Sequence, residues 1–488
     1  LAPPPRRGGF SMKALWFCPL ALLLSGCLLG PAHAPPQSAL PETIEVPVVD
    51  ERDGAEWLAW WRGFDDPALN ALIARALADN LDLRDQAARI RAARARLGFA
   101  KAEQLPTVDL QAEASRQQQP GAAFGIEGVP GTTRSLFSVS GVLGFELDLW
   151  GRLAREREAA AAQLAESVFA REALRLGLIA DVATTYFEYR AAQRQLAITH
   201  DAIATREASL ELQRVRYEGG VIDRLSVLQA RGELATARAR LPDQRQRLLQ
   251  LERALATLVG ASPRTLFEGL QLPEQALSAI DPLQHFPTLL PAELLVRRPD
   301  IRAADAALRA ANAAIGSAKA ARLPSVNLSA LVGSTAADAD ALFTGPAEAW
   351  NVGVSVLTPL VDFGRNAARV EEAEALRDRA ALQYRATVQT AFGEVRDALV
   401  SLQAANNRVE ALRAQRDAAR ETAELADIRY DAGATDFLTV LDARRNRLDA
   451  QLALSTALQQ RLTAAATLFK ALGGGWQPPD EGAAMAQS

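Results

Sequence analysis

The chain has 488 residues, 49% of them hydrophobic and 23% charged, and its 54 Lys and Arg against 58 Asp and Glu give a formal net charge of −4. It has no excess of basic residues to neutralise phosphates, which argues against a nucleic-acid partner. The three His and two Cys show no common metal-ligand spacing, and the sequence contains no glycine-rich phosphate loop. We therefore expect no enzymatic activity, no metal and no dissociable cofactor. The length excludes a single small domain.

The N-terminal region has the pattern of a bacterial lipoprotein signal peptide. Residues 1–11 read as an extension before Met12, which is followed by a basic residue and an apolar run too short to span a bilayer as a stable helix. The run ends in LSGC at Cys27, which resembles a lipobox, whose Cys is acylated in the mature protein. An ordinary signal peptide with an accidental Cys is the alternative. Leu28, in place of the Asp that often retains lipoproteins at the inner membrane, favours lipid anchoring at the outer membrane.

The second half of the chain repeats the first. The RYEGG segment that begins at Arg216 matches the RYDAG segment that begins at Arg429, an offset of 213 residues. Upstream the offset is 218, because Leu105-Pro106 matches Leu323-Pro324. The change in offset falls between paired strand segments, where a loop can absorb it. Two duplicated halves are the simplest account.

Each half is predicted to contain a helix, two strands, one very long helix, a turn and a returning helix. Residues 152–216 and 365–429 contain no Pro, and 65 helical residues would span about 98 Å. Apolar residues recur in them every seven positions, at Val388, Val395, Leu402 and Val409 and at Leu196, Ile203 and Leu210. The returning helices carry Leu248, Leu251, Leu255 and Leu258, and Leu462 and Phe469. These stripes predict packing seams between helices, not binding sites.

Four strands are expected at residues 108–113, 137–149, 326–329 and 350–356, where apolar and polar side chains alternate. A half-buried soluble sheet would show this alternation, and so would an outer-membrane β-barrel with lipid outside and water inside. The lipobox favours the barrel. Four strands are too few to close a barrel around a pore, so we expect several copies to assemble into a ring.

Several features together resemble the TolC/OprM (NodT-like) outer-membrane efflux factor family. They are the duplicated plan of Leu-Pro, two strands, a Gly-Arg junction and a long helix, the RY-x-x-G turns, FLTVLDARRNRLDAQ at residues 437–451, and KALGGGW ending at Trp476. The resemblance covers residues 56–476, and with the lipobox it indicates the OprM-like lipoprotein branch. It implies an α+β membrane protein, a homotrimer whose twelve strands form one barrel continued by a long α-helical coiled-coil tunnel in the periplasm. An inner-membrane pump of the RND type would pass cargo into the tunnel through a periplasmic adaptor (membrane fusion) protein.

The repeat and the resemblance together predict how the chain is divided. The expected segments are an extension and lipoprotein signal peptide (1–26), a lipidated segment with part of an equatorial collar (27–65), the first repeat (66–263), an inter-repeat equatorial segment (264–298), the second repeat (299–474) and a C-terminal tail (475–488). The Pro- and Leu-rich segment between the repeats is expected to contribute to the collar.

The resemblance also implies a gate that follows the second RY-x-x-G turn. Leu438 matches an apolar constriction, Asp442 an acidic ring, and Arg445 a position that ties neighbouring helices. Tyr430 matches the tyrosine whose contacts hold the coils shut. Thr439 stands where TolC has a second Asp, so we expect one acidic ring. From the residues alone, Asp442 and Arg445 could also be an exposed i,i+3 pair worth a few tenths of a kcal/mol.

The two turns are candidate contacts for the adaptor. They contain Gly219, Gly220 and Val221 in the first half and Ala432, Gly433 and Ala434 in the second. Small residues allow a sharp turn and let the backbone of another chain approach closely. A need for glycine in the turn alone would explain the same residues.

The sequence therefore predicts the outer-membrane exit duct of a tripartite efflux system, which passes small molecules such as drugs through a gate at its periplasmic tip. Within this class, the exit duct of a metal-efflux system or of a type I protein secretion system is an alternative. From a different class, a lipid-anchored periplasmic coiled-coil adaptor would have soluble sheet domains instead of lipid-facing strands.

Overall fold

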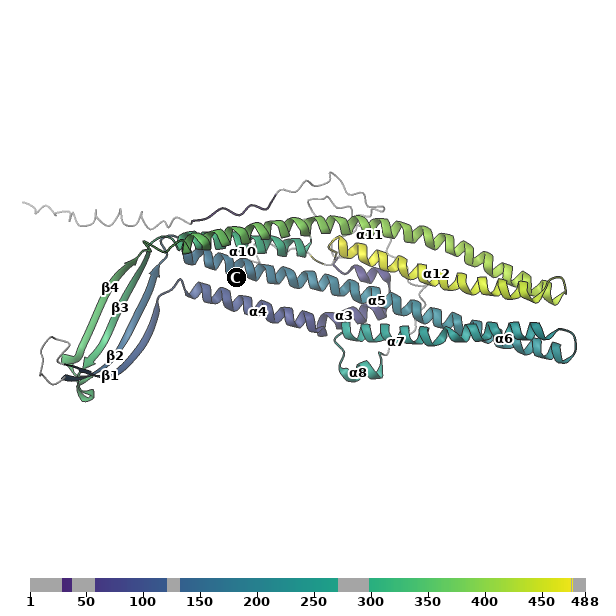
Figure 1. Ribbon diagram of the computed structural model, residues 1–488, viewed down its shortest axis with the longest axis horizontal. Helices are drawn as coiled ribbons and strands as arrows, with labels where there is room; N and C mark the ends of the chain where they lie inside the picture. Colours follow the sequence, from purple (N-terminus) through teal and green to yellow (C-terminus); the bar gives the residue numbers. More distant parts are fainter. Residues whose placement is uncertain (1–28, 37–57, 121–131, 271–297, 475, 477–488) are drawn as a thin grey trace, which may run out of the picture. The chain divides into compact units, whose positions relative to one another are not determined.

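The computed structural model describes residues 29–36, 58–120, 132–270, 298–474 and 476. Lipidation at Cys27 and most of the collar fall outside these residues and stay predictions. The described chain is mostly helical and contains one four-stranded sheet (Figure 1). It divides into two compact units, and each unit draws on both halves of the sequence. The first unit draws on residues 1–36, 90–166 and 304–384, and the second on residues 37–89, 167–303 and 385–488.

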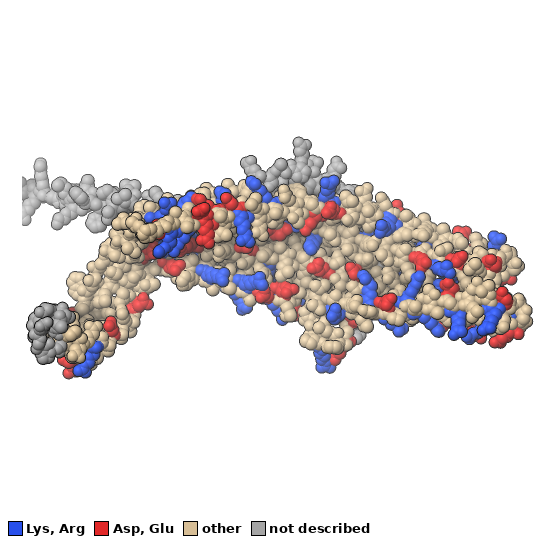
Figure 2. Space-filling model, viewed as in Figure 1, with Lys and Arg blue, Asp and Glu red and all other residues tan. Residues whose placement is uncertain are grey.

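The sheet belongs to the first unit. Its strands are β1 (Thr107–Gln119), β2 (Thr132–Leu147), β3 (Ser325–Ala336) and β4 (Glu348–Leu357), which pair antiparallel in this order. The four predicted strands are confirmed. Two short 3-10 helices, η5 (Ala339–Ala341) and η6 (Gly345–Ala347), lie between β3 and β4. On the face drawn in Figure 2, few charged side chains lie over the sheet, whereas both signs are interspersed along the helices.

The pairing of the strands follows the sequence repeat. Thr107 lies opposite Gly144 in the β1–β2 pair, and Ser325 lies opposite Leu357 in the β3–β4 pair. The upstream offset of 218 carries position 107 to 325, and the downstream offset of 213 carries position 144 to 357. The two hairpins are thus equivalent residue by residue, and the pairing of β2 with β3 joins them.

Two helices of 67 residues each, α5 (Arg152–Glu218) and α11 (Arg365–Asp431), follow the second strand of each hairpin. They confirm the two long helices predicted, and each runs two residues further. A carboxylate precedes the first turn and accepts backbone N–H groups there, Asp148 for α5 and Asp362 for α11. The heptad positions Val388, Val395, Leu402, Val409, Ile203 and Leu210 are buried, and Leu196 is half-buried.

The other helices of the described chain are η2 (Trp60–Phe64), α3 (Pro67–Asp79), α4 (Leu81–Ala102), α6 (Arg224–Ala239), α7 (Leu241–Leu258), α8 (Pro263–Glu268), α10 (Pro299–Ala320) and α12 (Phe437–Ala471). The prediction of one helix before the strands of the first half is wrong, because α3 ends at Asp79 before α4 begins at Leu81. The prediction of one returning helix in that half is also wrong, because α6 ends before α7 begins. Pro242 has no N–H to bond to the preceding turn and its ring crowds that turn, so the helix is interrupted near Arg240. The corresponding α12 runs for 35 residues without a break.

The core of the second unit gathers aromatic side chains from distant parts of the sequence. Trp60 of η2 stacks on Phe469 of α12 with ring centroids 5.0 Å apart. Phe64 meets Phe187 of α5 edge-on, with centroids 4.9 Å apart. Such pairs contribute about 0.5–1.5 kcal/mol each beyond the area they bury. These two ring contacts hold η2 against α5 and α12.

Among the residues described, we find no helix that combines the length and the apolar character needed to cross a membrane.

Candidate gate site at the helix turns

Two sharp turns connect α5 to α6 and α11 to α12. A glycine adopts a left-handed backbone in each, with φ of 71° at both Gly220 and Gly433. The Gly220 N–H donates to the Tyr217 carbonyl, and the Gly433 N–H donates to the Tyr430 carbonyl, both at 2.9 Å. The next residue donates to the carbonyl five positions back, at 2.9 Å in the first turn and 2.8 Å in the second, which completes a Schellman motif. The turn alone therefore requires glycine at these two positions.

The other candidate adaptor contacts flank these glycines, and all of them are exposed. They are Gly219 and Val221 in the first turn and Ala432 and Ala434 in the second. Val221 is an apolar side chain with 74% of its surface exposed. The turns thus present small and apolar groups to the outside of the chain.

An aspartate begins the returning helix in each half. Asp223 accepts a hydrogen bond from the Ser226 N–H at 3.2 Å. Asp436 accepts bonds from the Thr439 hydroxyl at 2.6 Å and the Thr439 N–H at 2.8 Å, and these bonds lower the pKa of Asp436, the hydroxyl most of all. Thr439, the position without a second acidic residue, is therefore a capping partner. The segments DRLS and DFLT carry this Asp-x-x-Ser/Thr signal, which is enough to predict both caps from the sequence.

Tyr430 ties the end of α11 to α5. Its hydroxyl donates to Oε1 of Gln213 at 3.1 Å, and its ring lies 5.4 Å from the ring of Phe437. The guanidinium of Arg216 lies over the Tyr430 ring at 5.3 Å and contacts Asp431 at 3.2 Å. Residues from both halves of the sequence therefore surround this side chain.

A series of ion pairs links three helices behind the second turn. Arg445 of α12 contacts Asp442 at 3.2 Å and Glu233 of α6 at 2.7 Å. Glu233 also contacts Arg206 of α5 at 3.2 Å, and these two side chains are only 15% and 10% exposed. The hydrogen bond that Arg445 donates to Glu233 raises the pKa of Arg445, whereas burial lowers the pKa of Arg206. The i,i+3 pair of Asp442 and Arg445 does form, but the shorter contact of Arg445 joins two helices.

Leu438 lies in the first turn of α12, where it is 50% exposed next to the buried Phe437. Its counterpart in the first half, Leu225, is 59% exposed. Each returning helix thus has an exposed apolar side chain in its first turn.

The sequence predicts neither Glu233 nor Gln213 as a site residue. Glu233 lies 212 positions from Arg445, and Gln213 lies 217 positions from Tyr430. The repeat aligns Arg445 with Gly232, so the contact between Arg445 and Glu233 has no counterpart in the other half. No local pattern marks Glu233 or Gln213 as a partner either. Among the residues that the structure describes, no three His, Cys, Asp or Glu are grouped to hold a metal.

The sequence and the fold both match known proteins. The profile of the Outer membrane efflux protein family matches residues 72–261 and 290–474. The chain is 33% identical over 482 residues to outer membrane protein OprJ of Pseudomonas aeruginosa, covering 98% of each protein. It is 34% identical over 470 residues to toluene efflux pump outer membrane protein TtgC of Pseudomonas putida, covering 96% of this chain and 93% of that protein. The open-state crystal structure of the Neisseria gonorrhoeae MtrE outer membrane channel matches with a TM-score of 0.81 at 30% identity, over 92% of this chain and 98% of that chain.

Proposed function

We propose that this chain, which belongs to the outer membrane efflux protein family, is the exit duct of a tripartite efflux system for small molecules. The observation that carries the proposal is the match of the family and of efflux-pump relatives along almost the whole chain. One of these relatives is named for toluene, and we infer apolar small molecules as the cargo class. The partners are a periplasmic adaptor and an inner-membrane pump of the RND type.

The assembly we propose is a homotrimer whose sheets close into one barrel, with the chains anchored by lipid at Cys27. Within the described residues, β1 and β4 are each hydrogen-bonded along one side only. Both edge strands also carry exposed apolar side chains: Val108 of β1 is 75% exposed and Val352 of β4 is 73% exposed. Unpaired backbone groups at a sheet edge and an exposed apolar face are both expected to be covered by another chain or by lipid. Pairing between copies would satisfy the edges, and lipid would cover the apolar face.

The gate we propose comprises Leu438, Asp442, Arg445 and Tyr430. Two contacts support this role. The ion pair from Arg445 to Glu233 holds the first part of α12 against α6, and the bond from Tyr430 to Gln213 holds the end of α11 against α5, with the Tyr430 ring packed on Phe437 of α12. Breaking these contacts would free α12 to move away from its neighbours and widen the duct. The exposed turns that precede the gate are where we place the adaptor.

Single-channel conductance in planar bilayers tests the duct and the gate. The detergent-purified wild type is compared with the Asp442→Ala, Arg445→Ala double variant. A small wild-type conductance that rises in the variant is the expected result. The matched control is Arg264→Ala with Glu268→Ala, which removes an exposed ion pair of 2.6 Å on α8 and should leave conductance unchanged.

The outcomes separate the parts of the proposal. If the folded double variant conducts no better than wild type, the gate assignment is wrong while the duct stands. If wild type and variant both fail to conduct although each forms trimers, the duct itself is contradicted. A rise in the control as large as in the double variant would assign the effect to charge loss in general.

A further inference from the structure

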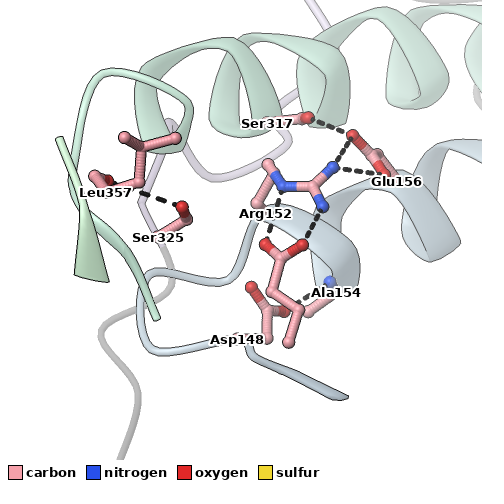
Figure 3. Close-up of polar contacts among 8 residues, drawn as sticks. Asp148, Arg152, Ala154, Glu156, Ser317, Ser325 and Leu357 are labelled. Carbon is pink, nitrogen blue, oxygen red and sulfur yellow. Dashed lines mark hydrogen bonds and ion pairs between the residues drawn. The ribbon is translucent and has the colours of Figure 1, made fainter. Parts of the chain in front are cut away.

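The junction between β2 and α5 is tied to the start of β3 in the same chain. The indole N–H of Trp150 donates to the carbonyl of Pro324 at 2.7 Å. Beside it, Arg152 contacts Glu146 at 2.7 Å. Arg152 also contacts Glu156 at 3.0 Å (Figure 3). Trp150 and Pro324 are half-buried. The two halves of one chain therefore meet in a covered joint.

The equivalent joint in the second half is open. The offset of 213 places Phe363 where Trp150 stands, and Phe363 is 99% exposed. Its φ of 51° lies in the left-handed region, which residues other than glycine rarely adopt. The offset of 218 places Pro106 where Pro324 stands, and Pro106 is exposed together with its neighbour Leu105. Both members of this second joint are thus uncovered, and they lie at the two outer strands of the sheet.

The strand register predicts how a second copy would close the joint. Within one chain, Gly141 of β2 lies opposite Val332 of β3. The two offsets that relate the hairpins carry this pair to Val354 of β4 and Ala114 of β1. The pairing keeps alternate apolar side chains on one face, since Val356 then lies opposite Ala112. Such a pair cannot form within one chain, because β2 and β3 separate the two strands.

We infer that Phe363 of one copy packs against Leu105 and Pro106 of the next, with β4 and β1 of the two copies paired so that Val354 faces Ala114. The inference rests on the proposed ring assembly and specifies its contacts. The side chain of phenylalanine has no N–H to donate to the Pro106 carbonyl. The joint between copies therefore lacks the hydrogen bond that Trp150 makes within a chain, and apolar contact holds it.

Disulfide trapping tests the register. The Val354→Cys, Ala114→Cys variant is oxidised in membranes and run on a non-reducing gel, where it should give covalent dimers and trimers. Directly opposed Cα atoms about 4.5–5.5 Å apart suit a disulfide, whereas diagonal pairs about 7–8 Å apart suit it poorly. Val354→Cys combined with Ala112→Cys or with Arg116→Cys is therefore the control, and both should cross-link less. More efficient cross-linking of either control pair would overturn the register.

Replacement of Phe363 tests the joint. Phe363→Asn should lower the temperature at which trimers dissociate to monomers, because asparagine tolerates the left-handed backbone and only the ring is lost. Phe363→Trp should leave the dissociation temperature equal to or above that of wild type, since it supplies the indole N–H that Trp150 has in the equivalent joint. Phe343→Asn is the control, as Phe343 is 82% exposed between β3 and β4. Equal dissociation temperatures for Phe363→Asn and wild type would contradict the joint. A wild type that sediments as a monomer would contradict the ring assembly instead.

Discussion

The two helix turns have the same backbone but different surroundings. Both contain a glycine with φ of 71° and the same pair of closing hydrogen bonds, and both are followed by a capping Asp. In the first turn Tyr217 is 44% exposed, whereas its counterpart Tyr430 packs on Phe437 and bonds to Gln213. The position of Phe437 is taken in the first half by Arg224, which is exposed. A duplicated local sequence thus builds the same turn twice, and long-range contacts reinforce only one of them.

The returning helices also differ between the two halves. The first is split into α6 and α7, while α12 is continuous. A movement at the first turn of a continuous helix is passed along its whole length, whereas a break between two helices can absorb it. This difference supports placing the gate at α12.

The largest expected effect comes from moving the helix break to the second half. Position 455 of α12 corresponds to Pro242. Ser455→Pro should destabilise the protein by about 3 kcal/mol or more, because proline removes a hydrogen bond and clashes with the preceding turn in a buried part of the helix. Thermal unfolding in detergent measures the loss. Pro242→Ser is the matched control and should have little effect, and a comparable loss there would show that the break has another cause.

The aromatic contact at the second turn should rank next. Phe437→Ala removes a ring that is 6% exposed and should cost about 3 kcal/mol. Arg224→Ala, at the equivalent exposed position, should stay within about 0.5 kcal/mol of wild type. Hydrogen exchange of the amides in the first turns of α12 and α6 reports each change locally. Similar loss of protection in both turns would remove the distinction between them.

The hydroxyl of Tyr430 makes a smaller contribution. Tyr430→Phe should cost about 1 kcal/mol, because it leaves the buried Gln213 without this donor. Tyr217→Phe removes the corresponding exposed hydroxyl and should be neutral. Denaturant unfolding of the two variants gives the comparison, and an equal cost would mean that the bond to Gln213 adds no stability.

The smallest effect concerns the cap of α12 and its dependence on pH. The pKa of Asp436 is lowered below its ordinary 3.8 by the bonds from Thr439. The carboxylate therefore stabilises the helix start above pH 3.8, and this stabilisation is lost as pH falls through the lowered pKa. Amide exchange in the first turn of α12 should accelerate over that acidic range. Asp436→Asn keeps an acceptor without the charge and should abolish this pH dependence, so an unchanged profile in that variant would assign it to another group.

Much of the fold follows from local patterns. The long helices lack proline, the strands alternate with period two, and glycine marks both turns. The break between α6 and α7 has a local signal in Pro242, and the break between α3 and α4 has one in Asn80, whose side chain accepts the N–H groups of Asp82 and Leu83. The caps at Asp223 and Asp436 have local signals too. These features depend on residues within a few positions of one another, so one stretch of chain is enough to determine them.

The partners of the candidate gate depend on the tertiary structure instead. The family resemblance implies Tyr430, Asp442 and Arg445 as gate residues, but nothing near them in the sequence marks Gln213 or Glu233. Those contacts exist because helices from the two halves pack side by side, and in that arrangement diverged positions of the repeat meet one another. Local sequence is therefore enough to specify the duplicated elements and their turns. Which of the two turns is held by buried partners depends on tertiary packing, because burial and ion pairing arise between segments that lie far apart in the chain.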